Sequence, residues 1–391
     1  MKNKTKGILL LILVSTVSFK VFSQSSSGEL NAIQTVVPFL TIAPDSRAGA
    51  MGDAGVATSP DAYSMHWNPA KFAFIDAKGG VGISYAPWLR TLVPDINIAY
   101  LAGYGRIDSK QVISGSLLYS SLGDIPFTDD FGNIERNFKP NEFAVDAGYT
   151  RLFSKYFSGG IAFRFIYSNL TGGSYAGGTA TKPGISFAAD ISSYYQRDIE
   201  VMKKDAVLAF GINFSNIGTK MSYTDSKEPD FIPMNLRLGS SGTIKLDKYN
   251  TITLAIDLNK LLVPTPPKYD PVTREIIAGM DPNVSVPVAI LHSFYDAPDG
   301  LIEELHEITY SFGTEYWYNN QFALRGGYFN EHETKGNRKY FTVGAGFRMN
   351  IFSLDFSYLI PLAQNHPLAR TLRFSLSFDF NSLRNASKGN G

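Results

Sequence analysis

The sequence of 391 residues contains no cysteine. Disulfide frameworks, thiolate-bound zinc, iron–sulfur clusters and cysteine nucleophiles are therefore excluded. A lipoprotein anchor is excluded as well, because such an anchor needs a cysteine to acylate. The chain must be stabilised, and must act, without any sulfur chemistry of this kind.

Charge is also scarce. Lys and Arg number 36 against 35 Asp and Glu, the formal net charge is +1, and charged residues make up 18% of the chain, against about 25% in a typical soluble domain. Without a basic excess, the chain is not expected to bind nucleic acid. Aromatic residues reach 13%, with 28 Phe and 21 Tyr, a composition that favours β structure.

Long hydrophobic runs are missing after residue 23, so that no later segment reaches the roughly 20 apolar residues of a transmembrane helix. At the start, the basic stretch Lys2–Lys6 precedes an apolar run, Gly7–Val14, and small or neutral residues precede Gln24. This pattern predicts a secretory signal peptide over residues 1–23. A membrane-anchoring helix is the alternative, but polar residues between Ser15 and Lys20 leave the run too short.

The exported chain shows period-2 alternation. In residues 374–380, three phenylalanines and one leucine alternate with two serines and one aspartate, and residues 352–358 and 161–167 show the same period. Alternation of this kind is typical of strands in a transmembrane barrel, where one face meets lipid and the other the lumen. A soluble β-sandwich gives much the same alternation, so the pattern alone leaves both open.

The number of strands and the lengths of their connections favour the barrel. Short and long connections alternate along the chain, as expected from the short periplasmic turns and long external loops of bacterial barrels. We therefore predict an all-β, fourteen-stranded antiparallel transmembrane β-barrel in the outer membrane, with both termini periplasmic. The expected strands are 79–89, 95–105, 111–121, 141–153, 157–168, 184–197, 205–216, 231–246, 250–260, 306–318, 320–330, 338–349, 352–360 and 370–381.

The segment before the first strand has a different character. Residues 47–57 are rich in Gly and Ala, and small residues permit tight backbone packing in a confined space. We expect residues 24–76 to fold inside the barrel as an N-terminal plug, or hatch. The expected organisation is a signal peptide (1–23), the hatch (24–76), the barrel (77–381) and a periplasmic tail (382–391).

Two motifs in this segment resemble a known family. Arg-Ala-Gly-Ala-Met-Gly-Asp-Ala at 47–54 and Trp-Asn-Pro-Ala at 67–70 resemble the amino-terminal hatch of the FadL superfamily of fourteen-stranded outer-membrane proteins, in particular the branch that serves type IX secretion. The superfamily's hatch motif maps onto Arg47, Gly49, Met51, Gly52, Asp53, Trp67, Asn68 and Pro69.

The resemblance implies a set of partners. Members of this branch capture secreted cargo by a C-terminal signal domain as it leaves a large outer-membrane translocon channel of the SprA type. They then carry it to a surface attachment complex, and they break no bond themselves. Membrane lipid, including lipopolysaccharide, is a further expected partner.

The residues show no set for chemistry. The five histidines fall in the plug or in predicted loops without the spacing of metal ligands, and Gly-x-Ser-x-Gly is absent. We therefore expect no metal, no cofactor and no catalytic residues. Charged residues on the lumenal face are expected to pair across the interior and hold the plug. They are Asp146, Arg164, Asp257, Glu315, Arg325, Arg348, Asp355 and Asp379.

Two predicted external loops carry apolar residues where polar ones are usual. Exposed apolar clusters mark contact surfaces, so we expect these loops to bind the translocon or the cargo. The alternative is that both loops fold over the barrel mouth and bury these residues on its rim. Residues 299–305 are expected to form a short helix. The candidate partner-binding residues are Trp88, Leu89, Leu92, Val93, Val286, Val288, Ile290, Leu291, Phe294 and Tyr295.

Three functional classes are considered in order of preference. The first is a binding and transfer protein that grips a β-rich signal domain. The second is a FadL-like transporter that carries hydrophobic small molecules past the plug. The third, an outer-membrane hydrolase, lacks a visible catalytic set.

Overall fold

A computed structural model of the chain describes residues 30–380, apart from residues 91, 92, 94, 129, 130, 132, 174, 177, 178, 226, 227 and 365. The predicted signal peptide, the predicted tail and the candidate residue Leu92 lie outside the described residues. No helix in the described ranges has the length and apolarity needed to cross a membrane.

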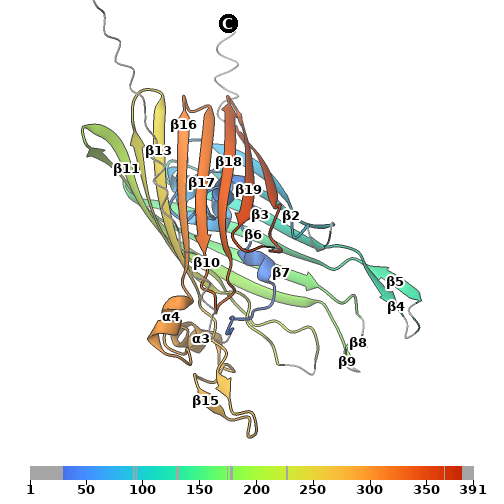
Figure 1. The fold of residues 1–391 in the computed structure, drawn as a ribbon. Helices are drawn as coiled ribbons and strands as arrows, with labels where there is room; N and C mark the ends of the chain where they lie inside the picture. The colour runs from blue at the N-terminus through green and yellow to red at the C-terminus, as the bar shows by residue number, and fades with distance from the viewer. Residues whose placement is uncertain are drawn as a thin grey trace, which may run out of the picture.

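Fourteen antiparallel strands form a closed barrel, which confirms the predicted fold (Figure 1). Each strand pairs with the next barrel strand along the chain, and β1 pairs with β20 to close the wall. The barrel strands are β1 (Gly79–Pro87), β2 (Ile96–Arg106), β3 (Gln111–Leu122), β6 (Asn141–Ser154), β7 (Phe157–Asn169), β10 (Gly184–Val201), β11 (Lys204–Gly218), β12 (Asn235–Lys245), β13 (Asn250–Leu261), β16 (Thr309–Tyr318), β17 (Phe322–Asn330), β18 (Lys339–Met349), β19 (Phe352–Pro361) and β20 (Leu372–Asp379).

Burial follows the predicted alternation. In β7, Phe163 is 67% exposed on the outer face, whereas its neighbours Ala162 and Arg164 are 2% and 7% exposed on the inner face. The outer face is therefore apolar and suited to lipid, and the inner face carries the small and charged side chains.

The two ends of the barrel differ. At one end, the short-turn end (top of Figure 1), neighbouring strands are joined by two to four residues, as at 155–156. At the other, the long-loop end, the connections run from eight residues to the 47 of loop 262–308. The predicted start of one strand at residue 231 is wrong: β12 begins at Asn235, because Pro233 has no N–H to give to a strand ladder.

Several long loops contain secondary structure of their own. Residues 299–305 were expected to be helical, and the helix found there begins two residues later. The strands within the loops are β4 (Ile125–Thr128), β5 (Ile134–Phe138), β8 (Tyr175–Ala176), β9 (Thr179–Ala180), β14 (Lys268–Tyr269) and β15 (Ile276–Ala278), and the helices are α3 (Val286–His292) and α4 (Leu301–His306).

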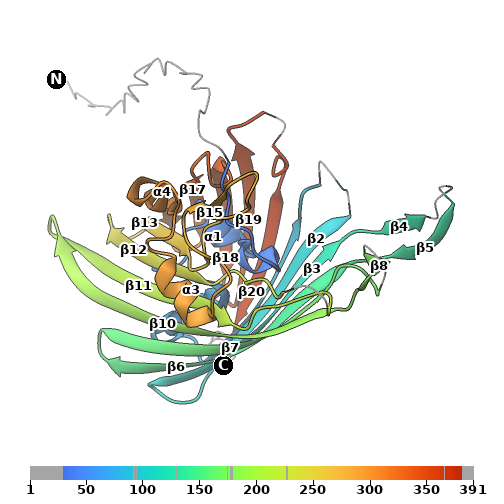
Figure 2. The ribbon, with the colours of Figure 1, turned by 90° about the horizontal axis from the view of Figure 1, so that it is seen from below.

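Residues 30–76, here called the luminal segment, lie inside the ring of strands (Figure 2). Asn31 hydrogen-bonds to residues of the long loops, whereas Lys78, just past the other end of the segment, accepts a bond from Arg106 beside a short turn. The segment therefore crosses the lumen from the long-loop end to the short-turn end. Its helical turns are η1 (Pro38–Thr41), α1 (Ser46–Gly49), α2 (Ser64–Trp67) and η2 (Pro69–Phe74).

Candidate functional site

A chain of buried ion pairs fixes the luminal segment to the wall. Arg47 of α1 binds both oxygens of Glu315 on β16, through Nε at 3.0 Å and NH2 at 2.8 Å, and its NH1 binds Asp61 at 2.9 Å. Arg325 on β17 donates to Glu315 at 2.7 Å and to Asp355 at 2.7 Å. The first motif residue thus completes a network of alternating charge, which compensates for the loss of water around each ion.

Backbone groups of the segment bind the wall as well. Asp257 on β13 accepts the N–H groups of Gly55 and Val56 at 2.7 and 2.8 Å. The Gly52 N–H donates to Thr342 Oγ1 at 2.8 Å, and Asp53 Oδ2 accepts from the Tyr340 hydroxyl at 2.6 Å. Because this segment is irregular, such bonds replace the ones a helix would supply.

Glycine is required where the segment touches the wall. Gly52 has φ +68°, and a Cβ there would lie 2.6 Å from backbone atoms of Tyr328. A Cβ on Gly327 of β17 would lie 2.1 Å from Gly52 N and from the carbonyl carbon of Met51. The two backbones meet without side chains between them, which explains why the motif needs small residues.

The second motif, at residues 67–70, holds the C-terminal half of the luminal segment in place. Trp67 Nε1 donates to Asp45 at 2.6 Å, and Asn68 Nδ2 donates to the carbonyls of Val56 and Ser193 at 3.1 and 3.0 Å. The Pro69 carbonyl accepts from the Thr150 hydroxyl at 2.8 Å. Seven of the eight motif residues are buried, and the eighth, Asp53, is partly buried and bonded to the wall through Tyr340. The motif therefore acts through packing and hydrogen bonds rather than through exposed side chains.

The predicted luminal charges mostly pair as expected. Arg164 binds Asp146 at 2.6 Å and Asp190 at 3.3 Å. Asp379 accepts instead from the Tyr104 hydroxyl at 2.9 Å, and Arg348 donates to Ser353 at 3.2 Å. Most of the predicted luminal charges are therefore paired around the segment.

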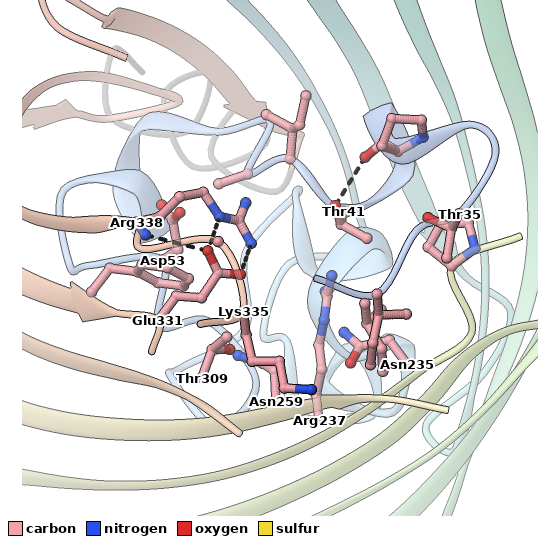
Figure 3. Close-up of a pocket in the computed structure, with 18 of the residues that line it drawn as sticks. Thr35, Thr41, Asp53, Asn235, Arg237, Asn259, Thr309, Glu331, Lys335 and Arg338 are labelled. Atoms are coloured by element: carbon pink, nitrogen blue, oxygen red, sulfur yellow. Dashed lines mark hydrogen bonds and ion pairs between the residues drawn. The ribbon is translucent and has the colours of Figure 1, made fainter. Parts of the chain in front are cut away.

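A cavity of about 330 Å³ lies at the long-loop end, between the luminal segment, the wall and the loops (Figure 3). Trp67 and Asp53 belong to the segment, Trp88 to the loop after β1, and Arg237 and Asn259 to the wall. A second cavity, of about 530 Å³, opens at the short-turn end and is lined by the charged network of Arg47 and Glu315. The segment separates the two.

Loop 262–308 is anchored at the long-loop end by buried ion pairs. Lys260 binds Glu304 at 2.9 Å and Glu307 at 2.6 Å, and Lys335 binds Glu303 at 2.6 Å and Glu307 at 3.0 Å. All five side chains are 9% exposed or less. The sequence analysis missed this cluster, whose members lie far apart in the sequence, at the end of β13 and in two long loops.

The candidate partner-binding residues divide by exposure. Trp88, Leu89, Val286 and Ile290 are half-buried and pack against interior clusters, so these four do fold onto the mouth. By contrast, Leu291 is 65%, Phe294 46% and Tyr295 60% exposed at the end of α3. Val93 is half-buried and Val288 is 37% exposed. Leu301, Ile302 and Leu305 on α4 are also exposed, and the sequence analysis does not count them among the candidate partner-binding residues.

Among the described residues, no group of three or more His, Asp or Glu side chains is placed to hold a metal ion. His66 is buried beside Trp67 in the luminal segment, and His306 stacks on His332 with ring centroids 3.5 Å apart. These histidines pack against rings.

The comparison with known families decides what the chain is. The sequence model described as type IX secretion system protein PorV matches residues 25–268, more than half of the chain. The chain belongs to the PorV family. The match begins before the luminal segment and ends beyond β13, so it includes both motifs and nine of the barrel strands.

Solved structures similar to this PorV-family chain include two toluene transporters and a FadL homologue. The Pseudomonas putida toluene transporter TodX is 10% identical, with a TM-score of 0.51 over 90% of this chain and 99% of that one. The Ralstonia pickettii toluene transporter TbuX is 10% identical (TM-score 0.43, coverage 85% and 96%). A Pseudomonas aeruginosa FadL homologue is 11% identical (TM-score 0.42, coverage 90% and 99%). The likeness to TodX concerns the fold alone, and no curated protein matches the chain.

Family and fold agree on the general role. The PorV family belongs to type IX secretion, and the closed barrel with an apolar outer face is a membrane structure. This PorV-family protein is therefore an outer-membrane component of the type IX secretion system.

One carboxylate in loop 262–308 makes the loop sensitive to pH. Burial, together with the neighbouring charges of Glu304 and Glu307, raises the pKa of Asp296 to about 6, although the Thr265 N–H donates to Asp296 at 3.1 Å. Because the pKa is higher in the folded loop than in an open one, this group favours folding most at low pH, and its contribution is lost as the pH rises through about 6.

We therefore expect Asp296→Asn to increase protection of the amides in residues 262–308 at pH 7.5 by about 1 kcal/mol, because the neutral side chain brings no charge into this buried position. Hydrogen exchange measured at pH 5 and 7.5 checks this. Asp281→Asn, an exposed change in the same loop, serves as the control. Lower protection in Asp296→Asn than in the wild type at pH 7.5 would contradict the expectation.

Proposed function

We propose that this protein binds the C-terminal signal domain of cargo leaving the translocon channel and transfers the cargo to the surface attachment complex. No covalent step belongs to this role. The proposal rests on the PorV family and on one observation: apolar side chains at the end of α3 stay exposed on a loop that buried ion pairs hold in place. Exposed apolar groups on an anchored loop are suited to binding a protein partner.

The orientation of the barrel is part of the proposal. Short turns face the periplasm in bacterial outer-membrane barrels, so the short-turn end is placed there and the long-loop end outside the cell. The end of β20 is then periplasmic, and the exposed residues of α3 face the place where cargo emerges. The luminal segment acts as the plug that keeps the pore closed to solutes.

A variant that places negative charge on the exposed apolar residues tests the binding role. Leu291→Glu combined with Phe294→Glu is expected to reduce recovery of translocon channel and of cargo in detergent pull-downs tenfold or more, as loss of apolar anchors does at other interfaces. These positions are exposed, so the barrel should remain folded and heat-modifiable on gels. Deleting residues 284–296 is a less clean test, because Ala289 is fully buried.

The matched control is Met202→Glu. Met202 is 91% exposed in the short turn between β10 and β11, at the opposite end of the barrel. The Met202→Glu variant should still bind both the translocon channel and the cargo. Unchanged recovery of cargo and channel with the α3 variant would exclude this loop as the binding surface.

Transport of hydrophobic small molecules remains the second candidate, because the fold resembles that of the toluene transporter TodX. Such transport needs an apolar path through the lumen. The cavity at the short-turn end is instead lined by Arg47, Asp61, Glu315, Arg325 and Asp355, which favours the transfer role. Lipid or aromatic solute co-purifying with the protein, in the absence of any cargo, would favour transport.

A further inference from the structure

The cavity at the long-loop end contains a cation without a counter-ion. Arg237 on β12 is 4% exposed, lines the cavity and donates one hydrogen bond, to the carbonyl of His66 at 2.9 Å. Its guanidinium also lies 5.1 Å from the Trp67 ring. No carboxylate of the described residues is within ion-pair distance of it, and a buried guanidinium in that state is costly.

The other charges around the cavity are already compensated. Lys335 is shared between Glu303 and Glu307, and Arg338 binds Glu331 at 2.7 Å. Asp53 accepts from Tyr340 and lies 3.9 Å from Arg373. Among the described residues that line the cavity, Arg237 is therefore the cation without a carboxylate at ion-pair distance, and it remains available to a ligand.

A ligand that binds Arg237 would carry a negative charge. The polar atoms near Arg237 indicate which chemical group of that ligand would lie next to its negative charge. Asn259 lines the same cavity, and its Oδ1 has no hydrogen-bond partner in the part of the chain that the structure describes. Figure 3 shows Arg237, Asn235 and Asn259 close together beside this cavity. A side-chain carbonyl that lacks a donor fits an amide N–H, which an alkyl chain does not offer.

We propose that this cavity binds the carboxy-terminal end of a peptide chain. The Arg237 guanidinium binds the terminal carboxylate, for which its planar fork is suited. Asn259 accepts a backbone N–H of the ligand, and the apolar side chains of Trp88 and Leu261 contact the last side chains. A volume of about 330 Å³ lies in the range of small-ligand sites. The site does not depend on the α3 surface proposed above.

Binding can be measured on the purified full-length protein in detergent. The chain has three tryptophans, and two of them, Trp67 and Trp88, line this cavity, so intrinsic fluorescence reports occupancy. The probes are an acetylated apolar tripeptide with a free carboxylate, its amide, hexanoate, and a small folded domain that ends in the same three residues. We expect the free-carboxylate peptide to bind at least tenfold more tightly than the amide and than hexanoate.

The small folded domain that ends in the same three residues distinguishes two sources of a peptide carboxylate, namely the end of a protein chain and a free peptide. This probe is called the fusion below. Binding of the fusion as tight as that of the tripeptide assigns the site to protein chain ends, and binding of the tripeptide alone assigns it to free peptides. Both results support a peptide-carboxylate site. Equal affinity for the acid and its amide would overturn the proposal, and so would tighter binding of hexanoate than of the peptide. This comparison uses only the wild-type protein and does not depend on the folding of a variant.

Variants then assign the contacts, with calorimetry as the readout because Arg237→Gln also changes the surroundings of Trp67. Arg237→Gln should lower the affinity for the acid at least tenfold, to that of the amide. Asn259→Leu should weaken peptide binding but leave hexanoate unchanged. The control is Arg348→Gln, at the other cavity, which should bind like the wild type. Unchanged affinity in Arg237→Gln would show that the guanidinium does not hold the ligand.

Discussion

Replacing Glu315 with glutamine is expected to lower the free energy of unfolding of the barrel by about 3–5 kcal/mol, the usual cost of removing one member of a buried ion network. Glu315 is bound by Arg47 from the luminal segment and by Arg325 from β17. Without its charge, two buried guanidinium groups face each other across a neutral amide. We expect the luminal segment to loosen as well, since Arg47 is its main ionic anchor to β16.

Urea unfolding in detergent, followed by the heat-modifiable shift on gels, measures this loss. Glu275→Gln, which changes the same chemical group at an exposed position of loop 262–308, is the control and should shift stability by less than about 0.5 kcal/mol. A Glu315→Gln barrel as stable as the control would mean that the network contributes no net stabilisation.

Gly327→Ala is expected to disrupt the contact between the luminal segment and β17. The added Cβ would lie 2.1 Å from backbone atoms of Met51 and Gly52, and backbone cannot rotate away as a side chain does. Overpacking of this kind typically costs about 1–3 kcal/mol, and the upper end is expected where backbone meets backbone. The expected result is a displaced segment, seen as new protease cleavage between residues 45 and 60.

The neighbouring position supplies a matched control for this prediction. A Cβ on Gly326 would meet nothing nearer than 3.8 Å, so Gly326→Ala keeps the segment in place and protected. Equal protease resistance in both variants would show that the wall moves to accommodate the methyl group at 327.

The strands could be predicted from the sequence because the two faces of a barrel wall meet different surroundings, lipid outside and the polar lumen inside. Residues 352–358 alternate between lipid and lumen without interruption, and β19 was found at Phe352–Pro361. Prediction failed where this constraint ends. The short helix α3 lies in a loop, and for its seven residues, with Pro287 in the first turn, the sequence predicts an external loop with apolar residues and no helix. Periodicity cannot distinguish so short a helix from an extended run.

The residues of the candidate site also divide into those that the sequence could identify and those that only the structure reveals. Arg47 and the motif glycines could be identified because they are close together in the sequence, and Glu315 could be expected to pair because it lies on a luminal face. The ion pairs of Lys335 with Glu303 and Glu307 join residues 28 or more positions apart in different loops, and no local pattern predicts them. Arg237 was missed for a different reason: its importance lies in having no counter-ion, which only the structure can show.

The position of the luminal segment has a consequence for how the protein is built. The segment precedes every strand in the chain, crosses the whole lumen, and is hydrogen-bonded to strands on opposite sides of the wall, such as Ser193 on β10 and Thr342 on β18. Once β1 has joined β20, a chain of this bulk has no lateral way in. The segment can make these bonds only when strands far apart in the chain have come together, so its final packing and the closure of the wall depend on each other.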